Sequence, residues 1–423
     1  MKLRLGILSQ WYEPEPGGAR IPGALARGLT SLGHDVHVLT GHPNYPDGRL
    51  YPGYEKQSWT TTASEGLSVT RVPLYPNHGS SAGRAINFGS FAVSAVGGGL
   101  RRMRGLDALW VYNSPVTVAL PMWALRHGAG VPIFLHNMDM WPDSVTAAGF
   151  SGNSRASQLA ERGLNVWCNR MYRSASVIGY ISPSAGEELA ARGVDRSKLR
   201  YLPLWADESL SFPDQSAGAA KRKELGISDD EILVMYAGTM GAAQGLERLV
   251  QAVMQRPGDT RIRCVLIGSG TREVHLRELA ASSSGRVQVL AGVPAASVGP
   301  FINAADIHYI GLAHNRMSTF TMPSKFQSVL AAGKALLVSA EGDVLVAARQ
   351  SGAALIAPLS GGVEALSDQI SVAEKLGRRG LFDMGSQGER HYRSELSESI
   401  GIRRVAVQLE SLARHRRRRP VEA

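Results

Sequence analysis

The chain has 423 residues, of which 44% are apolar and 19% are charged, and its formal net charge is +10. This length exceeds what one hydrophobic core usually serves, so two domains are expected, and the composition excludes a disordered or fibrous protein. Cys168 and Cys264 are the only cysteines, which excludes a disulfide framework and a cysteine-based zinc site and fits a reducing compartment.

The chain starts with MKLRLGILSQ, in which the apolar run already ends at Ser9 and Gln10. This run is too short for the core of a signal peptide and is typical of a buried first strand. No window of the sequence offers the roughly 18 uninterrupted apolar residues of a membrane-spanning helix. We therefore expect a cytoplasmic protein.

In the first half of the chain, short apolar runs alternate with helical patterns. The predicted strands are Leu3–Ser9, Asp35–Thr40, Leu67–Val72, Leu106–Tyr112, Pro132–His136 and Ser176–Ile181. The predicted helices are Ala19–Leu32, Arg84–Met103, Val116–Arg126, Ala156–Arg173 and Ser184–Arg192. This alternation predicts a parallel sheet with helices on both faces.

The alternation stops at Pro203–Ala220, where prolines and a run of small residues predict an irregular linker. A second series then begins, with strands at Ile232–Ala237, Ile262–Ile267, Val287–Leu290, Ile307–Ile310 and Ala335–Ser339. We predict an N-terminal domain at 1–208 and a C-terminal domain at 209–400. A final polar helix at 401–419 is expected to pack back on the first domain.

Basic residues cluster at two places along the chain. Arg101, Arg102 and Arg104 close the apolar stretch 84–104, and the run 414–419 holds five arginines and His415. Such clusters serve nucleic acid, anionic lipid or simply a solvated tail. Because no zinc-finger spacing, helix-turn-helix signal or RNA-binding aromatic signature accompanies them, no nucleic-acid partner is expected.

Glycine-bearing loops follow the first strand of each predicted domain. Gly17 and Gly18 precede the first helix, and Gly238, Gly241 and Gly245 follow the strand at 232–237. In open parallel sheets, ligands bind beyond the carboxyl ends of the strands, where backbone amides and helix N-termini favour anions. Each loop could also be only a tight turn. The sequence lacks the GxGxxG fingerprint and the Walker lysine motif, which disfavours a nicotinamide cofactor and a nucleoside triphosphatase.

Six motifs occur in an order and spacing typical of one enzyme family. They are PGG at Pro16–Gly18, HPNYPDG at His42–Gly48, HNMDMWPDS at His136–Ser144, LPLWADE at Leu202–Glu208, YAGTMGAAQGLE at Tyr236–Glu247 and MPSKFQSVLAAGKALL at Met322–Leu337. With these motifs nearly the whole chain resembles glycosyltransferase family 4, and within it the bacterial WbuB-like polysaccharide enzymes. The resemblance implies a GT-B fold, in which two Rossmann-like α/β domains face each other across a central cleft.

The resemblance also implies roles for particular residues. His136 and Asp139 would act near the transferred sugar, and Gly17 and Gly18 would bring backbone amides to the donor diphosphate or the acceptor. The other implied donor-binding residues are Gly238, Gly241, Gln244, Val293, Pro294, Lys325, Ser328, Glu341 and Gly342. Among them, Val293 and Pro294 belong to the loop that reads the nucleobase, and Lys325 would neutralise phosphate charge.

The residues themselves leave other readings open. His136 could be a core histidine, and Asp139 and Asp143 could only cap the turn around Pro142. Lys325 could be a solvated first-turn residue, although a lysine at a helix start opposes the helix dipole and so suggests a nearby anion.

The chain departs from the wider family at three positions. Two family glutamates, eight positions apart, align with Phe320 and Ser328, and the lysine of the family's glycine loop is Gln244 here. These losses keep a catalytically silent scaffold open besides a transferase. A sugar-nucleotide epimerase on the same architecture, which would need no acceptor, is a second alternative.

The favoured reading is a glycosyltransferase that uses a nucleotide-sugar, with a UDP-N-acetylhexosamine or a deoxy derivative as the expected donor. No DxD pair is present to hold a metal, so neither metal nor other cofactor is expected, and helix dipoles with Lys325 would stabilise the leaving phosphate. The resemblance implies retention of anomeric configuration. The acceptor is expected to be a lipid-linked glycan, with the stretch 84–104 and the C-terminal arginines docking the protein on the inner face of the membrane.

Overall fold

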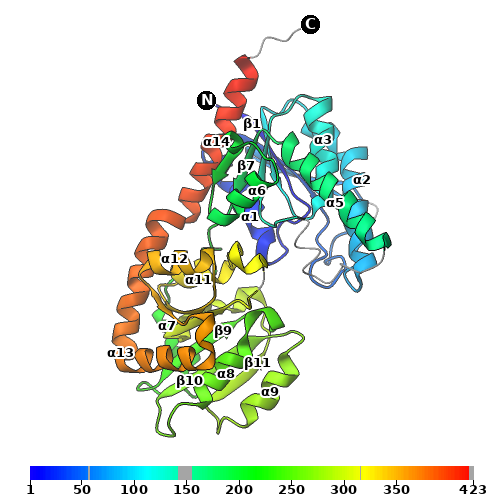
Figure 1. Cartoon of the computed structure of the whole chain (residues 1–423). Helices are drawn as coiled ribbons and strands as arrows, with labels where there is room; N and C mark the ends of the chain where they lie inside the picture. The colour runs from blue at the N-terminus through cyan, green and yellow to red at the C-terminus, as the bar shows by residue number, and fades with distance from the viewer. Residues whose placement is uncertain (56–57, 142–154, 315, 419–423) are drawn as a thin grey trace. The chain divides into compact units, whose positions relative to one another are not determined.

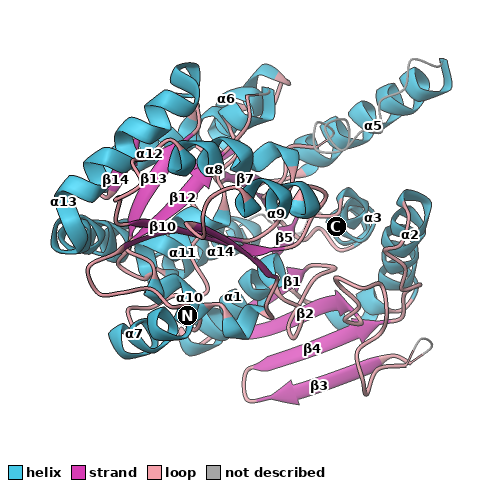
Figure 2. Ribbon diagram, turned by 90° about the horizontal axis from the view of Figure 1, so that it is seen from below, coloured by secondary structure: helices cyan, strands magenta, loops and turns pink. Residues whose placement is uncertain are grey.

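The protein, described as a computed structural model, forms two compact units. The description covers residues 1–55, 58–141, 155–314 and 316–418. Unit 1 comprises residues 1–203 with 401–423, and unit 2 comprises residues 204–400. Each unit has its own sheet with helices packed on it (Figures 1 and 2), so the predicted α/β architecture with two parallel-sheet domains is confirmed.

In the described part of unit 1, eight strands form a sheet in the order β3-β4-β2-β1-β5-β6-β7-β8. The strands are β1 (Arg4–Leu8), β2 (Asp35–Gly41), β3 (Thr60–Ser64), β4 (Leu67–Val72), β5 (Ala108–Tyr112), β6 (Ile133–Asn137), β7 (Val177–Tyr180) and β8 (Leu199–Tyr201). All neighbours pair in parallel except β3, which runs antiparallel to β4 at the edge. The central strands are largely apolar because helices cover both of their faces; every residue of β5 is buried, as is every residue of β1 after Arg4.

The helices of unit 1 follow its strands along the chain. They are α1 (Arg20–Ser31), α2 (Ser81–Gly97), α3 (Ala119–Gly128), α5 (Arg155–Ser174), α6 (Pro183–Ala191) and α14 (Glu398–Arg418), of which α14 begins three residues before the unit boundary. The predicted helix at 84–103 is shorter than expected. It ends at Gly97, and a 3-10 turn covers Gly99–Met103.

The described part of unit 2 has a sheet of six parallel strands in the order β11-β10-β9-β12-β13-β14. The strands are β9 (Ile232–Ala237), β10 (Ile262–Gly268), β11 (Val287–Ala291), β12 (Ile307–Gly311), β13 (Ala335–Ser339) and β14 (Ala354–Ile356). The helices are α7 (Gln215–Glu224), α8 (Leu246–Met254), α9 (Glu273–Ala281), α10 (Gly299–Ala304), α11 (Ser324–Ala331), α12 (Asp343–Ser351) and α13 (Gly362–His391).

The prediction of an irregular linker over Pro203–Ala220 is wrong in its second half. The small residues from Ser216 belong to α7, which begins where the Asp214 carboxylate accepts a hydrogen bond from the Ala217 N–H at 2.9 Å. The absence of a side chain at Gly218 lets α7 approach α10, since a Cβ there would lie 2.5 Å from the Asn303 carbonyl oxygen. The run of small residues therefore serves helix packing.

Both sheets contain a point where the order of strands reverses. In unit 1 the chain builds outward from β1 to one side and from β5 to the other, so the reversal lies between these two strands. In unit 2 it lies between β9 and β12. At such a point the loops after the two central strands diverge and leave a crevice at the carboxyl edge of the sheet, where ligands of open α/β sheets bind.

Candidate functional site

The loop after β1 brings its glycines to the carboxyl edge of the first sheet. Gly17 adopts φ 69°, in the left-handed region that glycine enters without strain, and it opens a short 3-10 turn that leads into α1. Gly18 lies against the next strand of the switch point, since a Cβ on Gly18 would be 2.7 Å from the Tyr112 hydroxyl. Only glycine therefore allows this close approach.

Asp139 lies beside the same switch point, in the loop after β6. The Asn113 side chain donates to the Asp139 carbonyl oxygen at 2.9 Å and accepts from the Asp139 N–H at 3.3 Å. Burial raises the pKa of the Asp139 carboxyl, and a hydrogen bond from the Ser114 side chain partly offsets this. The pKa of Tyr112 is raised by burial and by the charge of Asp139. Gly18, Tyr112 and Asp139 thus form one cluster.

His136 has the surroundings of a core residue. Its side chain is fully buried, stacks on the Phe134 ring at 5.7 Å between centroids, and contacts Trp110 edge-on. Its Nε2 donates to the Leu202 carbonyl oxygen at 3.2 Å, and burial lowers its pKa to about 4. The ring is therefore neutral at physiological pH. These contacts fit the alternative that His136 is a histidine of the hydrophobic core. The catalytic role of His136 stays a prediction that its contacts do not support.

A second polar cluster explains the HPNYPDG motif. Glu15 is buried and its Oε1 accepts hydrogen bonds from the N–H groups of Asn44 (2.7 Å) and Tyr45 (2.9 Å). Asn44 Oδ1 in turn accepts from His78 Nε2 (2.8 Å) and Asn87 Nδ2 (2.9 Å). Burial raises the pKa of Glu15, and the backbone hydrogen bonds lower it. The cluster holds the loops after β1, β2 and β4 together.

In unit 2 the glycine loop 238–245 is packed tightly on its neighbours. A Cβ on Gly268 would lie 1.8 Å from the Gly238 carbonyl oxygen, so the loops after β9 and β10 touch through their backbones. The Gly241 N–H donates to Gln244 Oε1 at 3.0 Å. Gln244, which stands where the family has a lysine, therefore uses its side-chain oxygen within the loop.

Lys325 reaches the base of this glycine loop from the start of α11. Its Nζ donates to the Tyr236 hydroxyl at 2.6 Å and lies 4.0 Å from the centroid of that ring, and the hydroxyl donates to the Thr239 carbonyl oxygen at 2.5 Å. A Cβ on Gly238 would be 2.8 Å from Nζ. Burial lowers the pKa of Lys325 to about 8. A lysine amine therefore lies at the switch point of the second sheet with no carboxylate recorded as its ion-pair partner among the described residues.

Glu341 and Gly342 lie at the carboxyl end of β13. Gly342 adopts φ 76° and precedes α12, and a Cβ there would lie 2.3 Å from the Thr319 carbonyl oxygen. Glu341 accepts a hydrogen bond from His314 Nδ1 at 2.7 Å, and both side chains are exposed. These contacts join the loops after β12 and β13.

Val293 and Pro294 belong to the loop after β11. The Val293 side chain packs against an apolar cluster that includes Leu233 and Ile267, and Pro294 is exposed. The preceding residue, Gly292, approaches Gly268. The loops after β11, β10 and β9 are thus consecutive neighbours along one sheet edge.

The positions of the two missing family glutamates are occupied differently. Phe320 is buried, whereas Ser328 lines a cavity of about 180 Å³ together with Lys325, Tyr309 and Ala237. Ser328 therefore lies beside open space next to Lys325.

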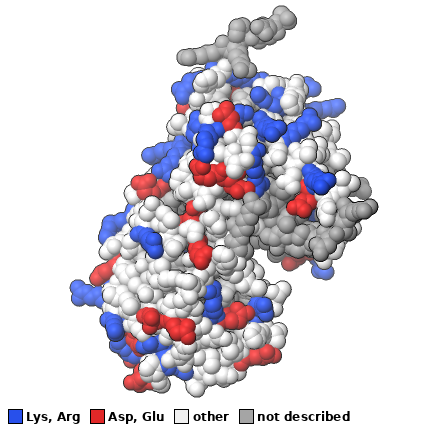
Figure 3. All heavy atoms as spheres, in the orientation of Figure 1, with Lys and Arg blue, Asp and Glu red and all other residues white. Residues whose placement is uncertain are grey.

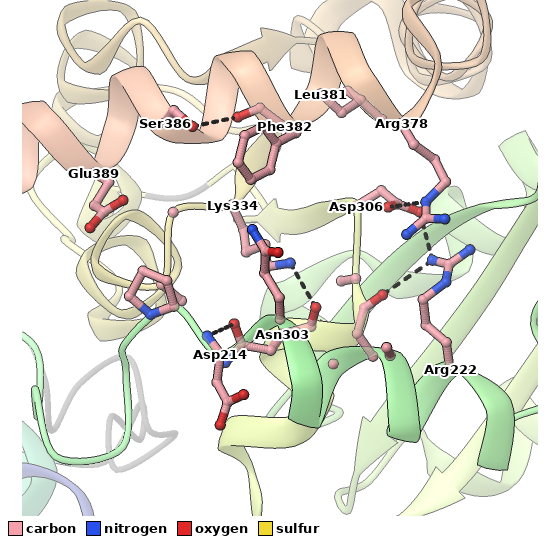
Figure 4. Close-up of a pocket in the computed structure, with 18 of the residues that line it drawn as sticks. Asp214, Arg222, Asn303, Asp306, Lys334, Arg378, Leu381, Phe382, Ser386 and Glu389 are labelled. Atoms are coloured by element: carbon pink, nitrogen blue, oxygen red, sulfur yellow. Dashed lines mark hydrogen bonds and ion pairs between the residues drawn. The ribbon is translucent and has the colours of Figure 1, made fainter. Parts of the chain in front are cut away.

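A larger cavity, of about 630 Å³, lies at the opposite edge of the second sheet (Figure 4). The Asp306 carboxylate there pairs with Arg222 at 2.8 Å and Arg378 at 3.1 Å, and Lys334 Nζ donates to the Asn303 carbonyl oxygen at 2.6 Å. None of the residues predicted to bind the donor lines this cavity. It is distinct from the candidate site.

Some predicted features fall outside what can be placed. Pro142–Ser144 of the HNMDMWPDS motif, including Asp143, and Arg419 of the basic tail lie outside the described residues. Among the described residues, no group of three His, Cys, Asp or Glu side chains is arranged to hold a metal ion. Within the same residues, no helix is both long and apolar enough to cross a bilayer.

The sequence reasoning missed Tyr112, Asn113, Glu15 and Tyr236. The first two could have been found from the sequence, because the polar residues Asn113 and Ser114 directly follow an apolar strand that ends at Tyr112. Glu15 and Tyr236 act through partners far away in the sequence, with 89 positions between Tyr236 and Lys325.

Comparison with known proteins agrees with this geometry. Residues 17–205 match the model of the glycosyl transferase 4-like domain. The chain is 25% identical over 341 residues to the putative colanic acid biosynthesis glycosyl transferase WcaI of Escherichia coli K12, covering 78% of this chain and 81% of that one.

Solved structures with the same fold include the catalytic domain of starch synthase IV from Arabidopsis thaliana (TM-score 0.71, 14% identity, 98% of this chain and 99% of that one). They also include Anabaena HepE in complex with UDP (TM-score 0.66, 14% identity, 97% of this chain and 100% of that one).

Two parallel-sheet units, each with glycine-bearing loops at its switch point, define a protein of the GT-B class. The match of residues 17–205 to the glycosyl transferase 4-like domain and the likeness to WcaI support a glycosyltransferase of family 4 type.

Proposed function

We propose that this glycosyltransferase moves an N-acetylated hexosamine, or a deoxy derivative of one, from UDP to a lipid-linked precursor of a cell-envelope polysaccharide. The observation that carries the proposal is the Lys325 amine, held against Gly238 at the switch point of the second sheet. A cation beside a backbone-lined crevice suits a diphosphate. The likeness to HepE, solved with UDP, supports the nucleotide, and the likeness to WcaI supports the polysaccharide pathway.

The transfer reaction requires no covalent bond between the protein and the sugar. As the bond between the sugar and the diphosphate breaks, the sugar develops oxocarbenium character and negative charge accumulates on the leaving phosphate. The Lys325 ammonium and the N–H groups of the loop 238–245 would stabilise that charge without a metal ion, because fixed dipoles need no reorganisation during the reaction. The family resemblance supports retention of configuration, so no dedicated base is assigned.

The acceptor would bind at the carboxyl edge of the first sheet. Gly17, Gly18 and Asp139 lie there beside Tyr112. A carboxyl group whose pKa is raised by burial is suited to hold a sugar hydroxyl by accepting its hydrogen bond or donating one. Asp139 is therefore proposed to orient the hydroxyl that attacks or a hydroxyl of the transferred sugar.

The proposal places the protein on the cytoplasmic face of a membrane, docked through α2. Phe91 on this helix is buried, whereas Ile86, Val93 and Val96 are 56, 66 and 40% exposed. Their spacing puts the three exposed side chains on one side of α2, and the exposed Arg101 and Arg102 follow shortly after the helix ends. An apolar helix face flanked by arginines suits the boundary between lipid head groups and acyl chains.

Thermal unfolding of the wild-type protein with a panel of nucleotide-sugars tests the donor. We expect UDP-N-acetylhexosamines to raise Tm and GDP-mannose and ADP-glucose to leave it unchanged, because a ligand that binds only the folded state stabilises it. Stabilisation by GDP-mannose and by no UDP-sugar contradicts the proposed donor. Stabilisation by a UDP-sugar without any transfer to lipid-linked acceptors favours the silent scaffold instead.

A further inference from the structure

A cavity of about 610 Å³ opens at the amino edge of the first sheet, opposite the loops that carry the candidate site. It lies where α3 ends before β6 and α5 ends before β7, and α14 closes it with Leu412, His415 and Arg416. All of these segments belong to unit 1. Its volume is within the range of about 300–1,000 Å³ that is typical of small-molecule sites.

The charged residues that line this cavity, called here the basic pocket, are all cationic or titrate to cations. They are Arg126, His127, Arg173, Lys198, His415 and Arg416. Among the described residues, no Asp or Glu lines it. In Figure 3, Lys and Arg side chains gather over the part of unit 1 where α14 ends. Four permanent positive charges therefore line one pocket that is open to solvent.

Two of these cations are fixed by backbone carbonyls. Lys198 Nζ donates to the Arg173 carbonyl oxygen at 3.1 Å, and Arg416 donates to the carbonyl oxygens of Ala129 (2.7 Å) and Leu106. Basic residues at helix C-termini commonly play this structural role. Because a carbonyl group is neutral, these contacts position the two charges without cancelling them.

The other two cations, Arg126 and Arg173, have no side-chain hydrogen bond or ion pair recorded within the described part of the chain. Lys198 interacts with Asp195, an exposed carboxylate whose pKa is lowered mainly by its hydrogen bonds with Ser197 and less by the charge of Lys198. The Asp107 carboxylate, next to Leu106, pairs with Arg417, which does not line the pocket. The C-terminal dipoles of α3 and α5 contribute about half a negative charge each. The negative charge from Asp195 and the two helix dipoles is smaller than the charge of the four cationic side chains, so the basic pocket keeps an excess of positive charge.

We infer that the basic pocket is a second anion site of this enzyme, built for a ligand with one or more phosphate groups. A phosphate monoester carries about −1.5 to −2 charges at neutral pH and presents three acceptor oxygens, which suits two unengaged guanidinium groups that each present a planar fork of donors. The phosphates could belong to a soluble metabolite or to the head group of an anionic lipid. The inference does not depend on which sugar is transferred.

The test compares the wild-type protein with the double variant Arg126→Ala/Arg173→Ala. Binding of inorganic pyrophosphate is measured by titration calorimetry, and binding to phosphatidylglycerol vesicles by flotation, with phosphatidylcholine vesicles as the uncharged reference. We expect the double variant to lose one class of pyrophosphate sites, or to bind the anionic vesicles at least tenfold more weakly. Arg126→Lys/Arg173→Lys should retain most of the binding, because it keeps the charges.

The matched control is Arg349→Ala/Arg390→Ala, which removes two exposed arginines from unit 2 and so changes net charge equally. If the Arg126→Ala/Arg173→Ala variant loses only pyrophosphate binding, the ligand is a soluble phosphate compound. If it loses only vesicle binding, the ligand is a lipid head group. Either result supports the inference. Equal binding by the wild-type protein and the Arg126→Ala/Arg173→Ala variant in both assays overturns it, as does an equal loss in the control. Sugar transfer to a soluble acceptor should be the same in the double variant as in the wild-type protein. If the proposed function is wrong, the wild-type protein itself will transfer no sugar, and this result is independent of the binding assays.

Discussion

At the scale of single residues, the partners that hold Lys325 within the described part of the chain are neutral. Tyr236 accepts its hydrogen bond and places its ring beneath the ammonium, but neither contact compensates for the desolvation of a full charge. The depressed pKa of about 8 expresses that cost. An anionic ligand beside Nζ would relieve it, and the proposed donor phosphate would be such a ligand.

We predict that Lys325→Ala lowers turnover at least tenfold while the fold is retained. A charge-assisted hydrogen bond to a phosphate contributes about 1.5–3 kcal/mol, and the Tyr236 hydroxyl keeps its bond to Thr239 in the variant. Steady-state kinetics with circular dichroism measures both effects. Lys223→Ala, which removes an exposed lysine of α7, serves as the control. Wild-type kinetics in a folded Lys325→Ala protein would exclude Lys325 from the site.

Lys325 should also determine how kcat/KM falls at alkaline pH. Because kcat/KM reports the free enzyme, it should fall as pH rises through about 8, where Lys325 loses its proton. Lys325→Arg should remain charged and keep its activity to higher pH. The stability of the protein should instead increase with pH. The pKa of Lys325 in the folded state lies below its unfolded value of about 10.4, so the free energy of unfolding rises as pH increases between those two values.

Residue by residue, the sequence predicted backbone roles better than side-chain environments. The glycines of both loops were found because a turn after a strand needs them, and the structure places them at the switch points. His136 shows the limit. Its place at the end of a strand suited either catalysis or the core, and only the surrounding Phe134 and Trp110 rings reveal burial. The partnership of Tyr236 with Lys325 likewise depends on tertiary packing.

At the scale of elements, apolar strands with helices on both faces were predictable and short edge strands were not. β3, β8 and β14 were missed because edge strands need no continuous apolar run; β3 reads TTTAS and most of its residues are exposed. Helix α7 was read as linker because Ser216 and Gly218 follow Pro213 in a run of small residues, although its alanines favour a helix. Its close packing on α10 also stabilises it.

The exposed apolar side of α2 leads to a prediction about docking. Ile86→Glu/Val93→Glu should reduce binding to phosphatidylglycerol vesicles at least tenfold, since each inserted apolar side chain contributes roughly 1.5–3 kcal/mol. Flotation at low and high salt measures this, and the charge-dependent part of wild-type binding should weaken at high salt. Val274→Glu/Val346→Glu alters two exposed valines of unit 2 and should have no effect. A wild-type protein that stays unbound at low salt contradicts docking.

At the scale of the whole molecule, the chain enters unit 1 twice. After unit 2 is complete, α14 returns and supplies Ile402, Val405, Leu409 and Ala413 as buried residues of the first unit. A Cβ on Gly28 would lie 2.5 Å from Ile402, so α1 and α14 are in close contact. Arg417 adds an ion pair with Asp107 at 2.8 Å. Unit 1 is therefore incomplete until the last helix has been made.

This connectivity predicts different behaviour for the two units when the chain is divided. A fragment of residues 204–400 contains a whole sheet and its helices and should fold alone. Residues 1–203 should fold only when a peptide of residues 401–418 is added, because each buried apolar side chain of α14 contributes roughly 1.5–3 kcal/mol and a domain's total stability is only about 5–15 kcal/mol. Circular dichroism and urea unfolding of the fragments, with and without the peptide, measure this. In the intact chain, Ile402→Ala should cost about 2–5 kcal/mol. A 1–203 fragment that folds cooperatively without the peptide would show that α14 is dispensable for the first core.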